Sequence, residues 1–549
     1  MPQITVSSQD KTKCTTVSVA AGETVLAGLK YLDIVVEGCC GGRGTCGKCA
    51  VYYESKAPDA YREEMWLGAE QIAAGLRLAC FHKVTEDIRI RLAGAMHFSG
   101  EYAPKMQIEG ADVRRCGGGA VAANQDMAAD ADITAAKAAG ELEYTVILDI
   151  GTTTLAAAFV RESDFGIERV LTRENSGRRF GSDVISRIHA ANEGSAAALQ
   201  AAAWADIHAL FETFTKEKHL PVGGTIRFRK LVVSANTVME HLLLGYSLRG
   251  LGEAPFQPVS LALTEQKKKE IFPEQSTLEE MSVLVLPGIS AFVGADIVAG
   301  LYAVSMDQEK GVTLFADIGT NGEMALGVDG KIYATAASAG PAFEGANIRD
   351  GAAGIEGAIQ QANLLGGRLV VGTIGAKPPV GICGTGVLEL ASELYRGGIL
   401  DRHGTFTDGT KRYPVAKRAD GSEICFTQED MRQLQMAKSA IRSGMELLLK
   451  KAGVNEDAVK KVWLAGGFGC KINVHKAALL GLLPKKLEKK TEAVGNTALT
   501  GAYRFEKACR ENGRLKEEQR LKALIEQADV LNLAEQPEFE TYYLHNMDF

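Results

Sequence analysis

The chain has 549 residues, a net charge of −7 and 46% hydrophobic residues, a length that corresponds to about three or four domains. The acidic balance argues against nucleic acid as the main partner. No run of about 18 apolar residues occurs, so we expect no membrane span. The first residues also lack the basic and apolar regions of a signal peptide, so we expect a cytoplasmic protein.

The first elements of the chain are those of a small domain rich in strands. Residues 4–20 alternate apolar and polar side chains, which predicts a β-hairpin, and residues 22–26 open a short helix. A cysteine-rich loop follows, and further strands are expected at 49–53 and 88–92. This order of hairpin, helix, loop and strands predicts an α+β fold of the β-grasp ferredoxin type over residues 1–96.

Five of the eleven cysteines lie between positions 39 and 80, and such clustering indicates a metal site. Cys40, Cys46 and Cys49 follow the pattern C-x5-C-x2-C, and Cys80 comes much later. A [2Fe–2S] cluster takes four thiolates, which ferredoxins draw from one loop and one distant turn. The spacing resembles that of adrenodoxin, whereas a zinc knuckle would usually need two CxxC pairs. We therefore predict a [2Fe–2S] cluster on these four cysteines, with Cys39 as the weaker alternative to Cys40.

Composition divides the rest of the chain. Residues 97–142 are partly Ala/Gly-rich and are predicted to form a linker. Two α/β lobes are expected to follow: residues 143–300 form the first, with insertions, and residues 301–549 the second, with a C-terminal extension. Aromatic residues within 539–544 favour a strand near the end of the chain.

An internal duplication relates the two lobes. The strand and turn around Asp149 recur 168 positions later around Asp317. In each copy an apolar strand brings an Asp to its end, where the carboxylate can hold Mg²⁺ directly or through water. Backbone N–H groups and hydroxyls of the following turn can then face phosphate oxygens. The residues predicted to contact ATP in this way are Gly151, Thr152, Thr153, Gly319, Thr320 and Asn321.

A third segment completes the predicted nucleotide site. Residues 462–465 predict a buried strand that ends in Gly466-Gly467, where the missing side chains leave room for a nucleoside. We expect Asp149 and Asp317 to position Mg²⁺ and the γ-phosphate, and either Asp317 or Glu323 to orient the attacking water. Glu323 could instead pair with a nearby Lys or Arg.

These segments resemble the actin, sugar-kinase and chaperone-type ATPase superfamily. The resemblance implies a duplicated RNase-H-like fold whose two lobes close over ATP at a hinge. It makes residues 149–154 and 317–321 the phosphate loops and 464–469 the adenosine motif. Segments 293–296 and 495–498 resemble the connections between the lobes, and Gly384 lies in a further stretch, Gly381-Ile382-Cys383-Gly384-Thr385-Gly386, that fits the resemblance.

The joining of a ferredoxin domain to this ATPase resembles the reductive activators of corrinoid proteins, over nearly the whole chain. The resemblance implies an enzyme that reduces Co(II) to Co(I), ATP-dependently, on the corrinoid protein of a methyltransferase system. Its cofactors would be the [2Fe–2S] cluster, ATP and Mg²⁺, with electrons from an unidentified low-potential donor, and a homodimer is one assembly left open. The alternatives are an ATP-gated docking factor for a corrinoid protein and an activator of another low-potential enzyme.

Overall fold

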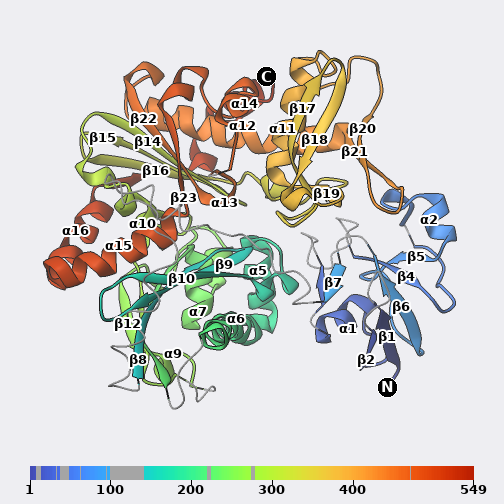
Figure 1. The fold of residues 1–549 in the computed structure, drawn as a ribbon, viewed down its shortest axis with the longest axis horizontal. Coiled ribbons are helices and arrows are strands. Elements are labelled where there is room, and N and C mark those ends of the chain that lie inside the picture. Colours follow the sequence, from blue (N-terminus) through green and yellow to red (C-terminus); the bar gives the residue numbers. More distant parts are fainter. Residues whose placement is uncertain are drawn as a thin grey trace.

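The N-terminal domain and two larger lobes make up the fold (Figure 1). The computed structural model describes residues 1–7, 14–32, 34–36, 49–61, 63–93, 96–98, 141–218, 224–273, 278–469 and 471–549. The predicted linker, 97–142, lies almost entirely outside these residues.

The N-terminal domain is built on a five-stranded sheet of order β2-β1-β6-β4-β5. Its strands are Gln3–Ser7 (β1), Cys14–Ser18 (β2), Ala50–Tyr53 (β4), Leu76–Leu78 (β5) and Ile88–Leu92 (β6). The other elements are α1 (Val25–Tyr31), a short pair of strands β3 (Ile34–Val36) and β7 (Met96–Phe98), η1 (Glu63–Met65) and α2 (Ala69–Ala73). Alternate residues of β1 and β6, such as Ile4 and Ile90, are fully buried together with Leu29 of α1. The predicted hairpin, helix and strands of a ferredoxin-like fold are therefore confirmed.

The first lobe has a six-stranded sheet of order β10-β9-β8-β11-β13-β12. Its strands are Glu141–Ile150 (β8), Thr154–Arg161 (β9), Ile167–Glu174 (β10), Thr225–Ala235 (β11), Thr264–Lys267 (β12) and Ser282–Val285 (β13). Its helical elements are η3 (Ser176–Arg179), α5 (Val184–Ala190), η4 (Ala191–Ser195), α6 (Ala196–Glu217), α7 (Thr237–Leu244), α8 (Arg249–Gly252) and α9 (Lys268–Ile271). Helices α6 and α7 bury their apolar faces on the sheet, with Trp204 and Leu243 in a shared core.

The second lobe has a sheet of order β23-β22-β14-β15-β16-β24. Its strands are Val312–Ile318 (β14), Gly322–Val328 (β15), Lys331–Ala337 (β16), Val459–Ala465 (β22), Thr491–Gly495 (β23) and Ala528–Val530 (β24). Smaller sheets pair β17 (Ala358–Leu365) with β18 (Arg368–Thr373) and β19 (Gly381–Ile382), and β20 (Arg412–Lys417) with β21 (Glu423–Thr427). The helical elements are η5 (Met306–Gln308), η6 (Pro341–Glu344), η7 (Ile374–Ala376), α11 (Gly384–Arg396), α12 (Gln428–Lys451), η8 (Glu456–Ala458), α13 (Gly466–Gly469), α14 (Val474–Leu479), η9 (Lys485–Lys490), α16 (Arg514–Glu526), η10 (Leu533–Glu535) and α17 (Phe539–His545).

The two large sheets repeat one topology, which confirms the predicted duplication. Strands β8, β9 and β10 form an antiparallel meander, and β11 and β13 extend the sheet in parallel on the other side of β8. Strands β14, β15, β16, β22 and β23 have the same order and directions. Helices α10 (Ala295–Ala303) and α15 (Thr497–Asn512) contribute to a core that includes residues from both sheets, such as Ile147 and Phe315. These helices begin in the two segments that the sequence indicated as connections.

The prediction of a strand over 539–544 is wrong, because these residues belong to helix α17. Phe539, Tyr542 and Tyr543 are spaced three and four residues apart and pack on the second-lobe core, whereas Leu544 is 64% exposed. The helical period of these contacts outweighs the strand preference of the aromatic residues.

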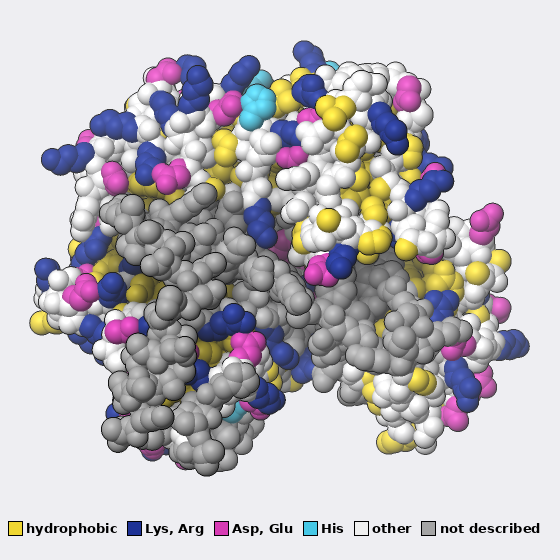
Figure 2. All heavy atoms as spheres, viewed as in Figure 1, with side chains coloured by type: hydrophobic (Ala, Val, Ile, Leu, Met, Phe, Trp, Pro, Cys, Tyr) yellow, Lys and Arg dark blue, Asp and Glu magenta, His cyan; other side chains and the backbone are white. Residues whose placement is uncertain are grey.

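The surface in Figure 2 carries Lys, Arg, Asp and Glu side chains interspersed over both lobes. Hydrophobic side chains gather over the β17–β18 hairpin, where Leu365 and Val370 are exposed. In the part of the chain that the structure describes, no helix is long and apolar enough to cross a membrane.

Candidate functional site

Each of the two predicted phosphate loops is closed by a backbone hydrogen bond from its glycine, although the two turns differ by one residue in span. In the first, the Gly151 N–H donates to the Thr154 carbonyl at 3.0 Å, and in the second the Gly319 N–H donates to the Asn321 carbonyl at 2.9 Å. Gly151 has no room for a side chain, since a Cβ would lie 2.8 Å from the Thr154 carbonyl oxygen. Each loop therefore follows an aspartate-bearing strand through a tight turn, as the sequence predicts.

Asp149 and Asp317, which precede these turns, are close enough to influence each other. Burial, the nearby Asp296 and then Asp149 raise the pKa of Asp317 to about 8. Burial raises the pKa of Asp149 to about 7, although a hydrogen bond from Asn496 opposes the shift. Carboxylates from the two lobes are thus brought together at one site, and both hold protons near neutral pH in the absence of a cation.

Glu323 belongs to the same group of carboxylates. It is the register partner of Asp317 in the β14–β15 pair, so both side chains lie on one face of the sheet. Burial, Asp296 and Asp317 raise its pKa well above the ordinary value, and the side chain of Asn321 hydrogen-bonds to it. Among the ion pairs of the described residues, none joins Glu323 to a Lys or Arg, which speaks against the pairing left open above.

Asp296 is a member of this group that sequence reasoning did not single out. It stands in the first turn of α10, and its carboxylate accepts a hydrogen bond of 2.8 Å from the Ile297 N–H. Its charge acts on Asp149, Asp317, Glu323 and Glu240. Its sequence signal was an acidic residue at the start of an apolar helix in a predicted connecting segment.

The carboxylates fit Mg²⁺ that arrives with a nucleotide. Among the described residues, no group of three or more His, Cys, Asp or Glu side chains is arranged to hold a metal ion. Mg²⁺ is usually held by one or two carboxylates, several waters and the phosphates of the substrate. Asp149 and Asp317 supply that number of carboxylates, so the residues present fit the predicted ion.

Three asparagines support the first lobe's part of the site, and each also caps a helix. The amide of Asn175 donates to the Gly151 carbonyl at 2.8 Å, that of Asn236 to the Thr152 hydroxyl at 3.1 Å, and that of Asn496 to Asp149 at 2.6 Å. Their side-chain oxygens accept backbone N–H groups at the starts of η3, α7 and α15, respectively. The fully buried Arg187 adds a hydrogen bond of 2.5 Å from Nη2 to the Thr152 carbonyl.

Two of the predicted phosphate-binding hydroxyls, those of Thr153 and Thr320, share an unpredicted partner. Both donate to the carboxylate of Glu344, at 2.9 and 2.6 Å. Glu344 ends the short helical turn η6, far from both threonines in the sequence. In the sequence, Gly340-Pro341 indicates the start of this turn, but no motif indicates a functional role for the Glu344 carboxylate.

The predicted adenosine motif lies at the end of β22, next to the carboxylates. Gly466 has φ +87°, and a Cβ there would lie 2.4 Å from Oδ1 of Asp317, so its missing side chain makes room for that carboxylate. Gly467 follows in α13. Gly384 starts α11, where a Cβ would lie 1.7 Å from the Phe343 carbonyl oxygen, so this position requires glycine for packing. Contact of these three glycines with the nucleotide stays a prediction.

The cysteine site is only partly described, because Cys39, Cys40 and Cys46 lie outside the described residues. Cys49 precedes β4 and Cys80 follows β5, and the Ala79 N–H donates to the Cys49 carbonyl at 2.8 Å, which places their backbones side by side. The fully buried Glu63 stabilises this end of the β4–β5 pair, because its carboxylate accepts a hydrogen bond of 2.5 Å from the Leu78 N–H. Two cysteines at neighbouring ends of adjacent strands fit a cluster with a loop ligand and a distant ligand.

The fold and the site define an iron–sulfur protein joined to a nucleotide-binding protein of the ASKHA type, the fold of actin and sugar kinases. Residues 8–85 match the 2Fe-2S iron-sulfur cluster binding domain, 144–309 the RACo middle region, and 311–549 the C-terminal domain of RACo, the ASKHA domain. The chain therefore belongs to the RACo family.

Individual relatives agree with this assignment. The chain is 31% identical over 426 residues to the corrinoid activation enzyme RamQ of Eubacterium limosum, which covers 74% of this chain and 70% of RamQ. It is 26% identical over 357 residues to the [Co(II) methylated amine-specific corrinoid protein] reductase of Methanosarcina barkeri, covering 59% of this chain and 63% of that one. Among solved structures, a reductive activator for corrinoid, iron-sulfur protein superposes with a TM-score of 0.66 at 25% identity, covering 100% of this chain and 98% of that chain.

Proposed function

We propose that this protein is an ATP-dependent reductive activator of a corrinoid protein in a methyltransferase system. Its substrate is the cobalt of that partner, which takes up one electron and passes from Co(II) to Co(I). The observation that carries the proposal is the presence in one chain of a ferredoxin domain and a duplicated nucleotide fold whose carboxylates converge from both lobes. The likeness to a reductive activator along the full chain supports it.

The cysteines of the N-terminal domain would hold the iron–sulfur cluster, which when bound supplies one electron at a time. Clusters of the plant ferredoxin type have potentials near about −400 mV. Transfer to a more reducing acceptor is uphill by about 2.3 kcal/mol for each 100 mV. ATP could offset that cost because its binding and hydrolysis change how the partner is held. An unidentified low-potential donor would then replace the electron.

The nucleotide site would supply alignment and charge neutralisation for ATP hydrolysis. Asp149 and Asp317 would hold Mg²⁺ on the phosphates, and Asp317 or Glu323 would orient the attacking water. The water oxygen forms a bond to the γ-phosphorus while the bond between the γ-phosphorus and the bridging oxygen of ADP breaks. The carboxylate that orients the water, Asp317 or Glu323, would accept its proton. Phosphoryl transfer needs little more than this from a protein.

The test is anaerobic reduction of a purified corrinoid protein, followed by the cobalamin absorption spectrum. With the reduced protein and ATP, Co(I) should accumulate, whereas without ATP or with a non-hydrolysable analogue it should not. Cys80→Ser should abolish the reaction and Asp317→Ala should reduce it to the level without ATP, with Cys14→Ser, an exposed cysteine of β2, as the control. Equal Co(I) yields with and without ATP would contradict the proposal.

A further inference from the structure

One carboxylate joins the two phosphate loops. The Thr153 hydroxyl lies in the first-lobe turn between β8 and β9, and the Thr320 hydroxyl lies in the second-lobe turn between β14 and β15. They donate to Oε2 and Oε1 of Glu344, respectively, at 2.9 and 2.6 Å. Both oxygens of the carboxylate are therefore in use, one toward each lobe.

This arrangement competes with the binding of a phosphate. A threonine hydroxyl has a single hydrogen to donate, and a phosphate oxygen accepts but does not donate. The hydrogen that Thr153 or Thr320 gives to Glu344 is not available to a nucleotide at the same time. The carboxylate also presents two anionic oxygens to hydroxyls of both loops, as a terminal phosphate would.

The surroundings favour an anion at this position. The charge of the fully buried Arg187 lies near Glu344. The hydrogen bonds that it donates to the described residues go to uncharged acceptors, namely the carbonyls of Thr152 and Gly181 and the sulfur of Met239. Asp183 and Asp206 also lie near this arginine. The guanidinium can stabilise either the carboxylate or a phosphate beside the first loop.

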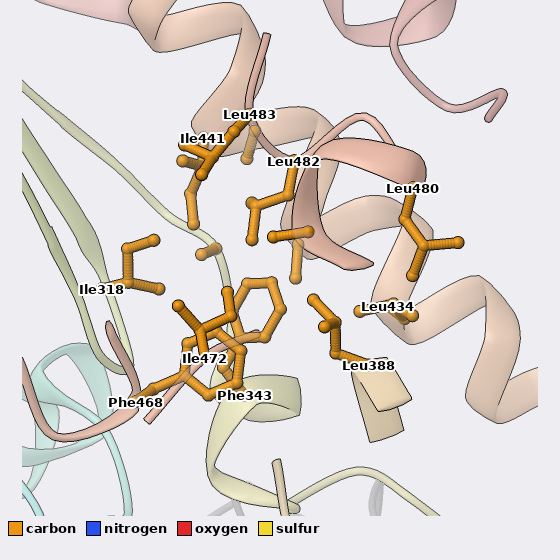
Figure 3. Close-up of a cluster of buried hydrophobic side chains, with 14 of the residues drawn as sticks. Ile318, Phe343, Leu388, Leu434, Ile441, Phe468, Ile472, Leu480, Leu482 and Leu483 are labelled. Atoms are coloured by element: carbon orange, nitrogen blue, oxygen red, sulfur yellow. The ribbon is translucent and has the colours of Figure 1, made fainter. Parts of the chain in front are cut away.

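Packing of the neighbouring Phe343 fixes the backbone at Glu344. Phe343 stacks on Phe468 of the predicted adenosine motif with ring centroids 4.5 Å apart, and Figure 3 shows the two rings together within the second-lobe core. The start of α11 packs on the other side, since Gly384 approaches the Phe343 carbonyl too closely to allow a side chain. Glu344 itself is half-buried, so its carboxylate can leave the threonines by side-chain rotation.

We propose that Glu344 is an internal anion that occupies the place of the terminal phosphate of ATP and is displaced by it. Without nucleotide, it links the two lobes through Thr153 and Thr320. With ATP bound, the γ-phosphate takes both hydroxyls and the carboxylate turns away. The inference rests on the proposed binding of ATP between the lobes, and it assigns to Glu344 the discrimination between ATP and ADP.

The test is nucleotide affinity measured by calorimetry with Mg²⁺ for the wild type and Glu344→Gln. An amide can still accept from one threonine but carries no charge to oppose a phosphate, so ATP should bind about tenfold more tightly, with little change for ADP. Glu356→Gln, an exposed acid in the same lobe, is the control and should change neither affinity. Unchanged ADP affinity also reports that the variant is folded.

A second measurement is the separation of spin labels on the two lobes without nucleotide. Glu344→Gln should broaden that distance distribution, and ATP should narrow it again. If Glu344→Gln weakens or leaves unchanged the affinity for ATP, the inference is overturned. If the wild type binds no ATP at all, the proposed function fails instead, so the two failures are distinguishable.

Discussion

Gly466 lies so close to Asp317 that a Cβ on the glycine would be 2.4 Å from Oδ1 of the carboxylate. The predicted adenosine motif and the predicted second phosphate loop therefore meet at a contact that only glycine permits. We predict that Gly466→Ala displaces the Asp317 carboxylate and lowers the rate of ATP hydrolysis at least tenfold. Steady-state hydrolysis with Mg²⁺ is the measurement.

Gly453 is the control that separates the contact with Asp317 from the effect of the left-handed backbone conformation. Gly453 also has a positive φ, +68°, but a Cβ there would meet nothing within 4 Å. Gly453→Ala should cost about 1–2 kcal/mol of stability through the left-handed conformation and leave hydrolysis unchanged. Equal hydrolysis in the two alanine variants would show that the contact with Asp317 has no role.

The carboxylates predict an unusual pH dependence of stability in the nucleotide-free protein. The pKa values of Asp149 and Asp317 are raised to about 7 and 8, above those of the unfolded chain. The folded state thus binds more protons between about pH 4 and pH 8, and stability is lost as the pH rises through this window. In Asp317→Asn this loss should be smaller. The difference in melting temperature, variant minus wild type, should therefore be larger at pH 8.5 than at pH 5.5, by on the order of 5 °C.

The measurement is thermal unfolding of both proteins across that pH range. Asp457→Asn should follow the wild type closely, since Asp457 is exposed and its surface ion pair with Lys486 contributes little to stability. A constant difference between wild type and Asp317→Asn across the range would mean that Asp317 does not titrate as described.

Local motifs explain why much of the fold and site could be predicted from the sequence. Asp149 and Asp317 each stand in a short strand-and-turn pattern, and the repeat of that pattern was enough to predict the duplicated lobes. Asp296 and Glu344 have no such pattern around them. Their places depend on how α10 and η6 pack against the loops, which is a long-range property of the chain. The helix at the C-terminus was missed because aromatic residues favour strands unless a core contact imposes a helical period.

The cluster ligands are the next prediction. Cys40→Ser, Cys46→Ser, Cys49→Ser and Cys80→Ser should each abolish or alter the visible absorption of a [2Fe–2S] cluster, because each removes one of four thiolates. Cys39→Ser and the exposed Cys14→Ser should keep the spectrum of the wild type. A normal spectrum for Cys40→Ser together with a bleached Cys39→Ser would show that Cys39 is the ligand. Anaerobic reconstitution followed by absorption spectroscopy tests all six.

Asp296 is predicted to act in hydrolysis more than in nucleotide binding. Its carboxylate is partly exposed at the start of α10, and its charge raises the pKa values of Asp149, Asp317 and Glu323. A carboxylate placed among those predicted to hold Mg²⁺ and the water would contribute to alignment and to proton transfer, effects worth roughly 10²-fold or more in rate. We expect Asp296→Asn to lower kcat about 10²-fold while the Kd for ATP changes less than about threefold.

Glu240 offers a matched comparison for Asp296. The charge of Asp296 raises its pKa too, but Glu240 is only 3% exposed and accepts a hydrogen bond from the Ala295 N–H, so it is less accessible to a nucleotide than Asp296. Glu240→Gln should therefore leave kcat within about threefold of the wild type. Hydrolysis and binding should be measured in parallel for both variants. A wild-type kcat in Asp296→Asn, or an equal loss in Glu240→Gln, would show that Asp296 acts only through the general charge of the site and not on the reacting groups.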